Sequence, residues 1–524
     1  MSAARTRVLA IGIDAASPEL LDQWIADGTL PNLAALCAGG VRARTHGLDG
    51  FFVGSTWPSM YTGANPASHG FHYQMQLVPG SYRLADRALG AFVEREPFWR
   101  ALTRAGKRVA VLDVPLSKLE PELRGVQVVE WGGHDAFFGH ATMPPELAVR
   151  IRERHGAHPL GISCDGAGRG AADYGALVAA LEEGVRRKTR WSMELLALGD
   201  WDLFMQVFTE SHCVGHQCWH LHDAAHPAFD RAMAATVGDP LRAVYRAIDG
   251  AVGELVRAAG DARVVVFSAH GMSHRFGAHF LLRDVLFALG AATPLASGPR
   301  ERVRAAASRV WRALPGGVRA WLAPLRRVSS SRRARRSAIA GLGVDTDRSR
   351  CFPLPNGLAV SGIRLNLAGR EPHGILAPGD DAEQFVMRLS KELLEITDET
   401  TGAPLVARVM RTCDLYAGEH LDALPDVLVE WSDSVAVGST TLGGGARSRV
   451  VARSPRVGTV KGANDYGRSG EHRAGGWLVA AGPGIASRQL DREPSLLDLA
   501  PTFARMLGVD LETADGQAIR ELTE

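Results

Sequence analysis

The chain has 524 residues, of which 46% are hydrophobic and 22% charged, and it carries a formal net charge of +2. This composition is typical of a globular protein and excludes a disordered or fibrous chain, while the charge indicates no particular partner. The length exceeds the size at which one hydrophobic core stops growing, so we expect one large domain with sizeable insertions, or two domains.

The first apolar run, at residues 8–13, ends at Asp14. It is too short for the hydrophobic part of a signal peptide, so we interpret it as a buried strand. No later stretch reaches the roughly 18 apolar residues that a membrane span requires. We therefore expect a soluble, cytoplasmic protein. The cysteines lack the spacing of a disulfide framework or a zinc site and are expected to be free thiols; they are Cys37, Cys164, Cys213, Cys218, Cys351 and Cys413.

Apolar runs of strand length alternate with helical patterns along the chain. After residues 8–13, further strands are expected at 108–113, 202–208, 263–268, 426–431 and 476–481. Helices are expected from Pro18, capped by Ser17, from Pro31, and over 95–105, 178–198, 240–258, 382–396 and 495–507. The alternation predicts an α/β fold with a mostly parallel central sheet and helices on both faces.

The composition changes between Arg300 and Arg336, where twelve arginines stand against a single acid, Glu301. One interpretation is a solvated, arginine-rich helical insertion. The other is a basic cap or lid that draws in an anionic substrate or contacts an anionic membrane surface. The expected organisation is a first part of the core at 1–280, an inserted basic cap or lid at 281–360, and a second part of the core at 361–524.

Polar residues stand next to several of the expected strands, where ligands gather in open parallel sheets. They are Asp14, Thr56, His212, His216, His270 and His472. A carboxylate, a hydroxyl and four histidines suit a divalent metal site, with zinc as the first choice. The first two histidines are four residues apart and share one face if that stretch is helical. Each histidine alone is more often structural than a ligand, so the joint placement carries the prediction.

Thr56 stands at an expected helix start. A threonine hydroxyl becomes an effective nucleophile when metal coordination lowers its pKa, and backbone N–H groups at a helix start favour phosphate oxygens. Considered without the other residues, Thr56 is better explained as a plain N-cap.

Eight segments of the chain, in order from near residue 8 to near residue 509, match those of a known family. They are VLAIGIDAASPELLDQWIADGTLPNLAAL, STWPSMYTGANPASHGF, WGGHDAFFG, SAHGM, GIRLNLAGREPHGIL, LPDVLVEW, SGEHRAGGWLVAAGPGI and SLLDLAPTFARMLGV. With them the chain resembles the alkaline phosphatase superfamily, in its type I phosphodiesterase and nucleotide pyrophosphatase branch. It is most similar to the bacterial group of predicted phosphohydrolases/phosphomutases.

The resemblance implies a central sheet that holds two metal ions about 4 Å apart, and a threonine that forms a covalent phospho-enzyme. By this resemblance Thr56 is the nucleophile and Asp14 and His270 hold the metal that it binds. His216 and His472 hold the other metal. Zinc is the expected cation and manganese the alternative.

Two positions depart from the family pattern. Ala269 stands where the family has an aspartate ligand, and His212 stands where it has another. The two changes remove two negative charges from a site meant for two cations, which should weaken the metal site next to Thr56. A single metal on His212, His216 and His472 is therefore an alternative, since three histidines and an open position form a known catalytic zinc arrangement. His274, His279 or Glu210 could replace the missing ligand.

The leading hypothesis is a phosphodiesterase or phosphatase that acts through a Thr56 adduct. One alternative keeps the fold but acts on a sulfate ester, a phosphonate or a biosynthetic intermediate, or transfers the group. Another is a degenerate homologue that binds a ligand without catalysis.

The expected partner is a small anionic phosphoester; no nucleic acid duplex is expected, and the oligomeric state stays open. Three further residues are candidates for substrate binding. His134 could line the pocket or cap a turn, and Trp219 could contact substrate or pack in the core. Arg364 could serve a lid or a structural ion-pair network.

Overall fold

The structure, a computed structural model, describes residues 7–87, 93–132, 136–161, 163–166, 168–295, 340–437, 449–464 and 466–524. The arginine-rich stretch 300–336, with its expected cap and membrane contact, lies outside the described residues. No helix within these ranges is both long and apolar enough to cross a membrane. The cytoplasmic location stays a prediction. The six cysteines are free thiols, as predicted.

A nine-stranded sheet forms the centre of the molecule, in the order β21-β2-β20-β9-β1-β8-β5-β6-β7. The five neighbouring strands β9, β1, β8, β5 and β6 are parallel, whereas β20 and β7 run antiparallel to their neighbours. The predicted mostly parallel α/β fold is therefore confirmed. The strands are β1 (Val8–Ile13), β2 (Val41–Thr45), β5 (Val109–Leu112), β6 (Gly125–Val129), β7 (Ala141–Met143), β8 (Leu203–Phe208), β9 (Arg263–Ser268), β20 (Gly476–Ala481) and β21 (Arg488–Gln489).

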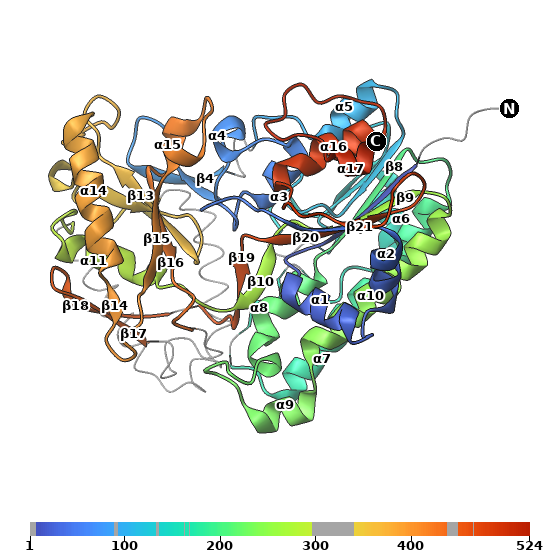
Figure 1. The fold of residues 1–524 in the computed structure, drawn as a ribbon, viewed down its shortest axis with the longest axis horizontal. Coiled ribbons are helices and arrows are strands. Elements are labelled where there is room, and N and C mark those ends of the chain that lie inside the picture. Colours follow the sequence, from blue (N-terminus) through green and yellow to red (C-terminus); the bar gives the residue numbers. More distant parts are fainter. Residues whose placement is uncertain are drawn as a thin grey trace.

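Helices cover both faces of this sheet (Figure 1). Alternate residues of β1 point to opposite faces: Leu9 and Ile11 belong to one hydrophobic cluster, and Val8 and Ala10 to another. The first cluster includes residues of α1 (Pro18–Ala26), α2 (Pro31–Gly39), α7 (Ala171–Leu196), α8 (Glu210–His222) and α10 (Pro240–Ala259). The second includes residues of α3 (Thr56–Thr62), α5 (Phe98–Arg104) and α16 (Leu499–Met506). Because both faces of β1 are covered, its sequence is a continuous apolar run.

A second, four-stranded antiparallel sheet lies on the opposite side of the molecule from α7 and α10 (Figure 1). Its order is β12 (Cys351–Leu354), β13 (Val360–Leu365), β16 (Val427–Trp431) and β15 (Val406–Arg411), and α14 (Asp380–Leu394) accompanies it. The strand expected at 426–431 exists, but it belongs here and not to the central sheet. A strand with two buried faces has the same apolar run in either sheet, so the sequence pattern could not distinguish them.

The predicted boundary after residue 360 falls within β13, directly after its first residue, and β13 pairs with β12; the three-part division stays a prediction. The remaining elements are β3 (Met75–Leu77), β4 (Arg83–Asp86), β10 (Gly271–His274), β11 (Ala340–Gly341), β14 (Thr397–Asp398), β17 (Arg449–Ser454), β18 (Gly458–Ala463), β19 (Gly470–Arg473), α4 (Pro66–His69), α6 (Glu146–His155), α9 (Arg231–Val237), α11 (Leu282–Ala288), α15 (Thr412–Leu415) and α17 (Arg520–Thr523), with short 3-10 turns between them.

Candidate functional site

Three imidazoles converge close to the carboxyl end of β8. His212 and His216 lie one turn apart on α8, and His472 lies on β19. Their Nε2 atoms are 3.2 Å apart for His212 and His216, 3.1 Å for His216 and His472, and 3.3 Å for His212 and His472. All three residues are buried. Within the described part of the chain, this is the one group of three or more such side chains whose ligand atoms could share an ion.

The local geometry of α8 and β19 explains this convergence. α8 begins directly after β8, and the four-residue spacing puts both of its histidines on one face. β19 pairs antiparallel with β10, which sets His472 opposite Met272. A Cβ at Gly470 would lie 2.2 Å from the carbonyl oxygen of Gly215, so β19 approaches α8 this closely only because Gly470 has no side chain.

The spacing of the three nitrogens fits a tetrahedral zinc ion. With zinc–nitrogen bonds of about 2.0–2.1 Å, two ligands of a tetrahedral site lie about 3.3–3.4 Å apart. The observed separations of 3.1, 3.2 and 3.3 Å come close to this value. Nδ1 of His216 donates to the carbonyl oxygen of Gly470 at 2.9 Å, which leaves the lone pair of the neutral ring on Nε2. The residues therefore fit a divalent cation.

Asp14 and His270 lie next to this group, but their ligand atoms are farther apart than those of the three histidines. The ring centroids of His270 and His472 are 4.6 Å apart, and Nε2 of His270 is 4.0 Å from Oδ1 of Asp14. Trp57 donates its indole N–H to the same Oδ1 at 2.8 Å. The separation of 4.0 Å is longer than the edge of about 3.3 Å in a tetrahedral zinc site. This pair is therefore less well arranged for a metal than the three histidines.

His270 has the character of an uncharged ligand. Burial lowers the pKa of its imidazole to about 3, so the ring is neutral at physiological pH. Its Nδ1 is buried and has no hydrogen-bond partner among the described residues. Ala269, which stands where the resemblance implies an aspartate, is fully buried and belongs to the hydrophobic core.

Thr56 is the first residue of α3 and is buried. The N-cap of α3 is Ser55, and the Thr56 hydroxyl donates to the carbonyl oxygen of Phe52 at 2.8 Å. The plain N-cap alternative is therefore wrong. The neighbouring Trp57 connects the start of α3 to Asp14.

The structure bears differently on the three residues that were predicted to bind substrate. His134 lies outside the described residues. Trp219 is buried in a hydrophobic cluster and its ring packs against His222, which supports packing and not substrate contact. Arg364 lies on β13, where its Nε donates to Glu371 at 2.8 Å and its Nη1 to the carbonyl oxygen of Leu424 at 2.8 Å. These contacts support the structural ion-pair alternative.

One residue that the sequence analysis missed reaches the histidine group. Nη1 of Arg468 lies 3.2 Å from Nε2 of His216. The same guanidinium forms an ion pair with Asp165 at 3.0 Å. Arg468 stands four residues before His472, and no motif indicated its role.

A buried charged cluster supports the start of α8. Nζ of Lys188, on α7, lies 2.8 Å from Asp113 and 3.5 Å from Glu210, and His158 lies 3.2 Å from Glu210. Burial would lower the pKa of Lys188, but Asp113 and Glu210 raise it above its ordinary value. Glu210 is thus committed to this cluster and does not join the three histidines.

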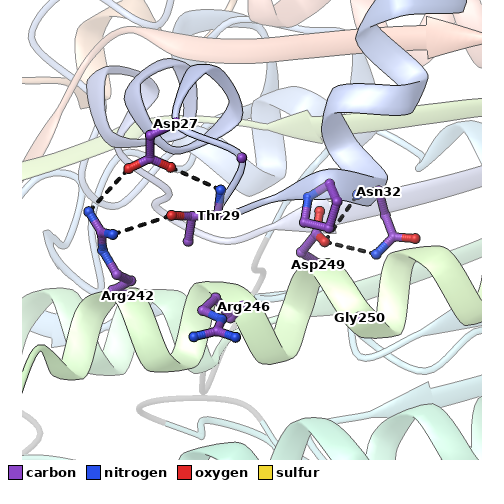
Figure 2. Close-up of a pocket in the computed structure, with 9 residues that line it drawn as sticks. Asp27, Thr29, Asn32, Arg242, Arg246, Asp249 and Gly250 are labelled. Atoms are coloured by element: carbon purple, nitrogen blue, oxygen red, sulfur yellow. Dashed lines mark hydrogen bonds and ion pairs between the residues drawn. The ribbon is translucent and has the colours of Figure 1, made fainter.

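A separate pocket of about 470 Å³ opens between the α1–α2 turn and α10 (Figure 2). Its polar groups bond mainly to one another: Arg242 contacts Asp27 and Thr29, and Asp249 accepts from Asn32. No predicted site residue lines this pocket.

Comparisons with known proteins agree with this architecture. The family model described as type I phosphodiesterase / nucleotide pyrophosphatase matches residues 8–330, more than half of the chain. Among solved structures, the chain is similar to phosphonoacetate hydrolase from Sinorhizobium meliloti 1021, with 15% identity over 95% of this chain and 94% of that chain and a TM-score of 0.50. It is also similar to the alkaline phosphatase PafA, with 13% identity over 100% of both chains and a TM-score of 0.52. At these identities the likeness shows the fold alone, and no curated protein matches. Through its family match, the chain belongs to the type I phosphodiesterase/nucleotide pyrophosphatase family.

Proposed function

We propose that the protein is a metal-dependent hydrolase of small phosphate esters. The convergence of the Nε2 atoms of His212, His216 and His472 within 3.1–3.3 Å carries this proposal. Three histidine ligands with an open fourth position form a catalytic arrangement for zinc. Membership of a phosphodiesterase and pyrophosphatase family supports ester hydrolysis as the reaction class.

The three histidines would hold one divalent cation, zinc in the first place and manganese as the alternative. When bound, such a cation stabilises negative charge on phosphoryl oxygens as a Lewis acid. A second cation on Asp14 and His270 has less support. Their ligand atoms are 4.0 Å apart, and Ala269 supplies no carboxylate.

Thr56 is the proposed nucleophile. Its Oγ1 would attack phosphorus while the bond between phosphorus and the leaving-group oxygen breaks; the hydroxyl proton passes to water, and the leaving-group oxygen keeps the bonding electron pair and takes up a proton from water. A second water molecule would then attack the phosphorus of the phosphothreonine and break its bond to Oγ1, which takes back a proton; phosphate is released from a monoester and a monoester from a diester. Before the attack, the Thr56 hydroxyl donates its hydrogen bond to the carbonyl oxygen of Phe52. The lone pairs of Oγ1 are therefore directed away from this carbonyl and can attack phosphorus.

Direct attack by water, without a Thr56 adduct, is the second candidate. The three-histidine arrangement supports it, because that arrangement does not need Thr56 as a ligand. Both candidates predict hydrolysis of phosphate esters by the zinc-loaded protein, and they differ in the role of Thr56.

Thr56→Ala separates these candidates. Thr62→Ala is a matched control, because Thr62 lies on the same helix and its Oγ1 also donates to the carbonyl four residues earlier, that of Pro58 at 2.7 Å. With p-nitrophenyl phosphate and bis-p-nitrophenyl phosphate as substrates, we expect Thr56→Ala to lose about a thousandfold or more in kcat, and Thr62→Ala to retain activity. Acid quenching should trap phosphothreonine in the wild type and in Thr62→Ala, but not in Thr56→Ala.

Three results would contradict these assignments. Activity retained by Thr56→Ala, with no trapped adduct in the wild type, favours direct attack by water. Absence of bound metal, together with no hydrolysis after zinc or manganese is added, overturns the enzyme proposal and favours the ligand-binding alternative. Hydrolysis of a sulfate ester or a phosphonate in place of the phosphate esters favours the altered-site alternative.

A further inference from the structure

The pocket between the α1–α2 turn and α10 has the size of a small-molecule site. Its volume of about 470 Å³ lies in the range of ligand pockets, about 300–1,000 Å³. Arg242, Arg246 and Asp249 of α10 line one side, and residues of the turn between Asp27 and Asn32 line the other (Figure 2). The pocket shares no residue with the histidine group, so we consider it as a site of its own.

Both acidic side chains of this pocket are already bonded to neighbours. Asp249 is 2% exposed. It accepts from the backbone N–H groups of Asn32 and Leu33, at 3.2 and 2.8 Å, and from the Asn32 amide at 2.8 Å. Asp27 forms an ion pair with Nη2 of Arg242 at 3.2 Å. Neither carboxylate is therefore left to balance a further positive charge.

Arg246 supplies such a further charge. It is exposed, lies one helical turn from Arg242, and forms no hydrogen bond or ion pair with any residue that the structure describes (Figure 2). Side chains four residues apart on a helix are neighbours, with about 5–6 Å between their Cβ atoms, and like charges at this spacing repel each other. An anion bound by both guanidinium groups removes this repulsion.

Arg242 is held in place before any ligand binds. Its Nη2 donates to Asp27 at 3.2 Å and its Nη1 to the hydroxyl of Thr29 at 3.3 Å. The guanidinium also lies 5.6 Å from the centroid of the Trp24 ring, a cation–π contact. Because these contacts already fix the side chain, a ligand that accepts from its other N–H groups costs little additional ordering.

Gly250 leaves one side of the pocket open. A Cβ at this position would meet no atom within 4 Å, whereas a Cβ at Gly253 would lie 2.1 Å from Oδ1 of Asn32. Close packing therefore explains the glycine at 253 but not the one at 250. Glycine destabilises the interior of a helix, and at Gly250 the absent side chain leaves space next to Arg246 that a ligand can occupy.

We propose that this pocket binds the phosphate group of a small, polar phosphorylated molecule, with Arg242 and Arg246 as the residues that recognise the phosphate. A phosphate monoester presents three strong acceptor oxygens, so it can accept from both guanidinium groups, whereas a carboxylate has only two oxygens. The planar guanidinium matches phosphate oxygens in geometry. The polar side chains of Thr29 and Asn32 suit the hydroxyl groups of a sugar phosphate. This site does not depend on the proposed function, because none of its residues belongs to the candidate metal site.

Isothermal titration with glucose 6-phosphate tests the site. The full chain carrying His216→Ala is used, so that the candidate metal site is disrupted and binding reports the pocket. Glucose 6-phosphate should bind, and glucose, which lacks the phosphate, should not. Adding Arg246→Ala should weaken the binding of glucose 6-phosphate about tenfold or more. Adding Arg257→Ala is the matched control and should leave the affinity unchanged, because Arg257 is exposed on the same helix but does not line the pocket.

Gly250→Glu tests the pocket without removing an arginine. The added side chain should fill the open space and its carboxylate should pair with Arg246, four residues earlier, so that glucose 6-phosphate no longer binds. The variant should keep its Tm or raise it, because glutamate is a better helix former than glycine and its Cβ meets no other atom. Gly175→Glu, on α7, is the matched control: a Cβ there also meets nothing within 4 Å, and Gly175 does not line the pocket.

Three results would overturn the proposal: no binding of glucose 6-phosphate, equal binding of glucose, or unchanged affinity in both Arg246→Ala and Gly250→Glu. Hydrolysis of phosphate esters by the wild type together with any of these results refutes the pocket and leaves the proposed function intact. A protein that binds glucose 6-phosphate through Arg246 but hydrolyses no phosphate ester confirms the pocket and refutes the proposed function.

Discussion

Lys188 joins α7 to the start of the helix that carries two of the three histidines. Its Nζ lies 2.8 Å from Asp113 and 3.5 Å from Glu210, and none of the three side chains is exposed. Lys188→Met keeps most of the side-chain length and removes the charge, which leaves two carboxylates buried without their cation. Breaking a buried ion pair in this way costs about 3–5 kcal/mol. We expect the free energy of unfolding to fall by that amount.

In Lys188→Met, the contribution of Glu210 to the pH dependence of the free energy of unfolding should also change sign. Burial would raise the pKa of Glu210, but Lys188 and His158 lower it below its ordinary value of 4.5. A carboxyl group with a lowered pKa stabilises the folded wild type above its unfolded pKa, and this contribution is lost as the pH falls through the folded pKa. Without Lys188, burial and the nearby Asp113 raise the pKa of Glu210, so the folded variant takes up a proton. The contribution of Glu210 to the stability of the variant should therefore increase as the pH falls toward the ordinary pKa of 4.5.

Urea unfolding followed by tryptophan fluorescence, at several pH values, measures both effects. Arg186→Met, on an exposed part of the same helix, is the control and should cost less than about 0.5 kcal/mol. A loss below about 1 kcal/mol in Lys188→Met, or a variant that loses stability as the pH falls toward 5, would refute the reasoning that the buried cluster holds α8 in place.

Two further predictions concern the metal. Zinc at about 100 times its Kd should stabilise the wild type by about 2.7 kcal/mol, and His216→Ala should abolish the zinc-dependent rise in Tm; equal shifts in both proteins would contradict the three-histidine site. The wild type should retain one zinc ion per chain after dialysis and Ala269→Asp should retain two, as determined by elemental analysis; two ions in the wild type would contradict the single-cation assignment.

Much of the fold could be predicted because the core strands of the central sheet are short apolar runs bounded by polar residues. The convergence of His212, His216 and His472 followed from the same reasoning, since two of them share a helical face and the third was expected from the family resemblance. Arg468 could not be predicted, because its direction is set by Asp165, 303 residues earlier in the chain. The burial of Lys188 could not be predicted either. Its neighbours Arg187 and Arg190 are partly or largely exposed, so the sequence suggested a solvated face, and only tertiary packing buries it.

The two departures from the family pattern have unequal consequences, and together they favour one cation over two. Two divalent cations about 4 Å apart repel each other by about 17 kcal/mol at an effective dielectric constant of 20. A carboxylate bonded at about 2 Å attracts a divalent cation by a similar amount, so carboxylate ligands are what make such a pair stable. By the resemblance, His212 replaces a carboxylate with a neutral side chain that can still ligate, and its Nε2 lies together with those of His216 and His472. By the same resemblance, Ala269 removes both the charge and the ligand, next to a pair whose ligand atoms stand 4.0 Å apart. We therefore expect the three-histidine site to bind one cation while its neighbour does not, and returning an aspartate to position 269 is the substitution that should bring back the second cation.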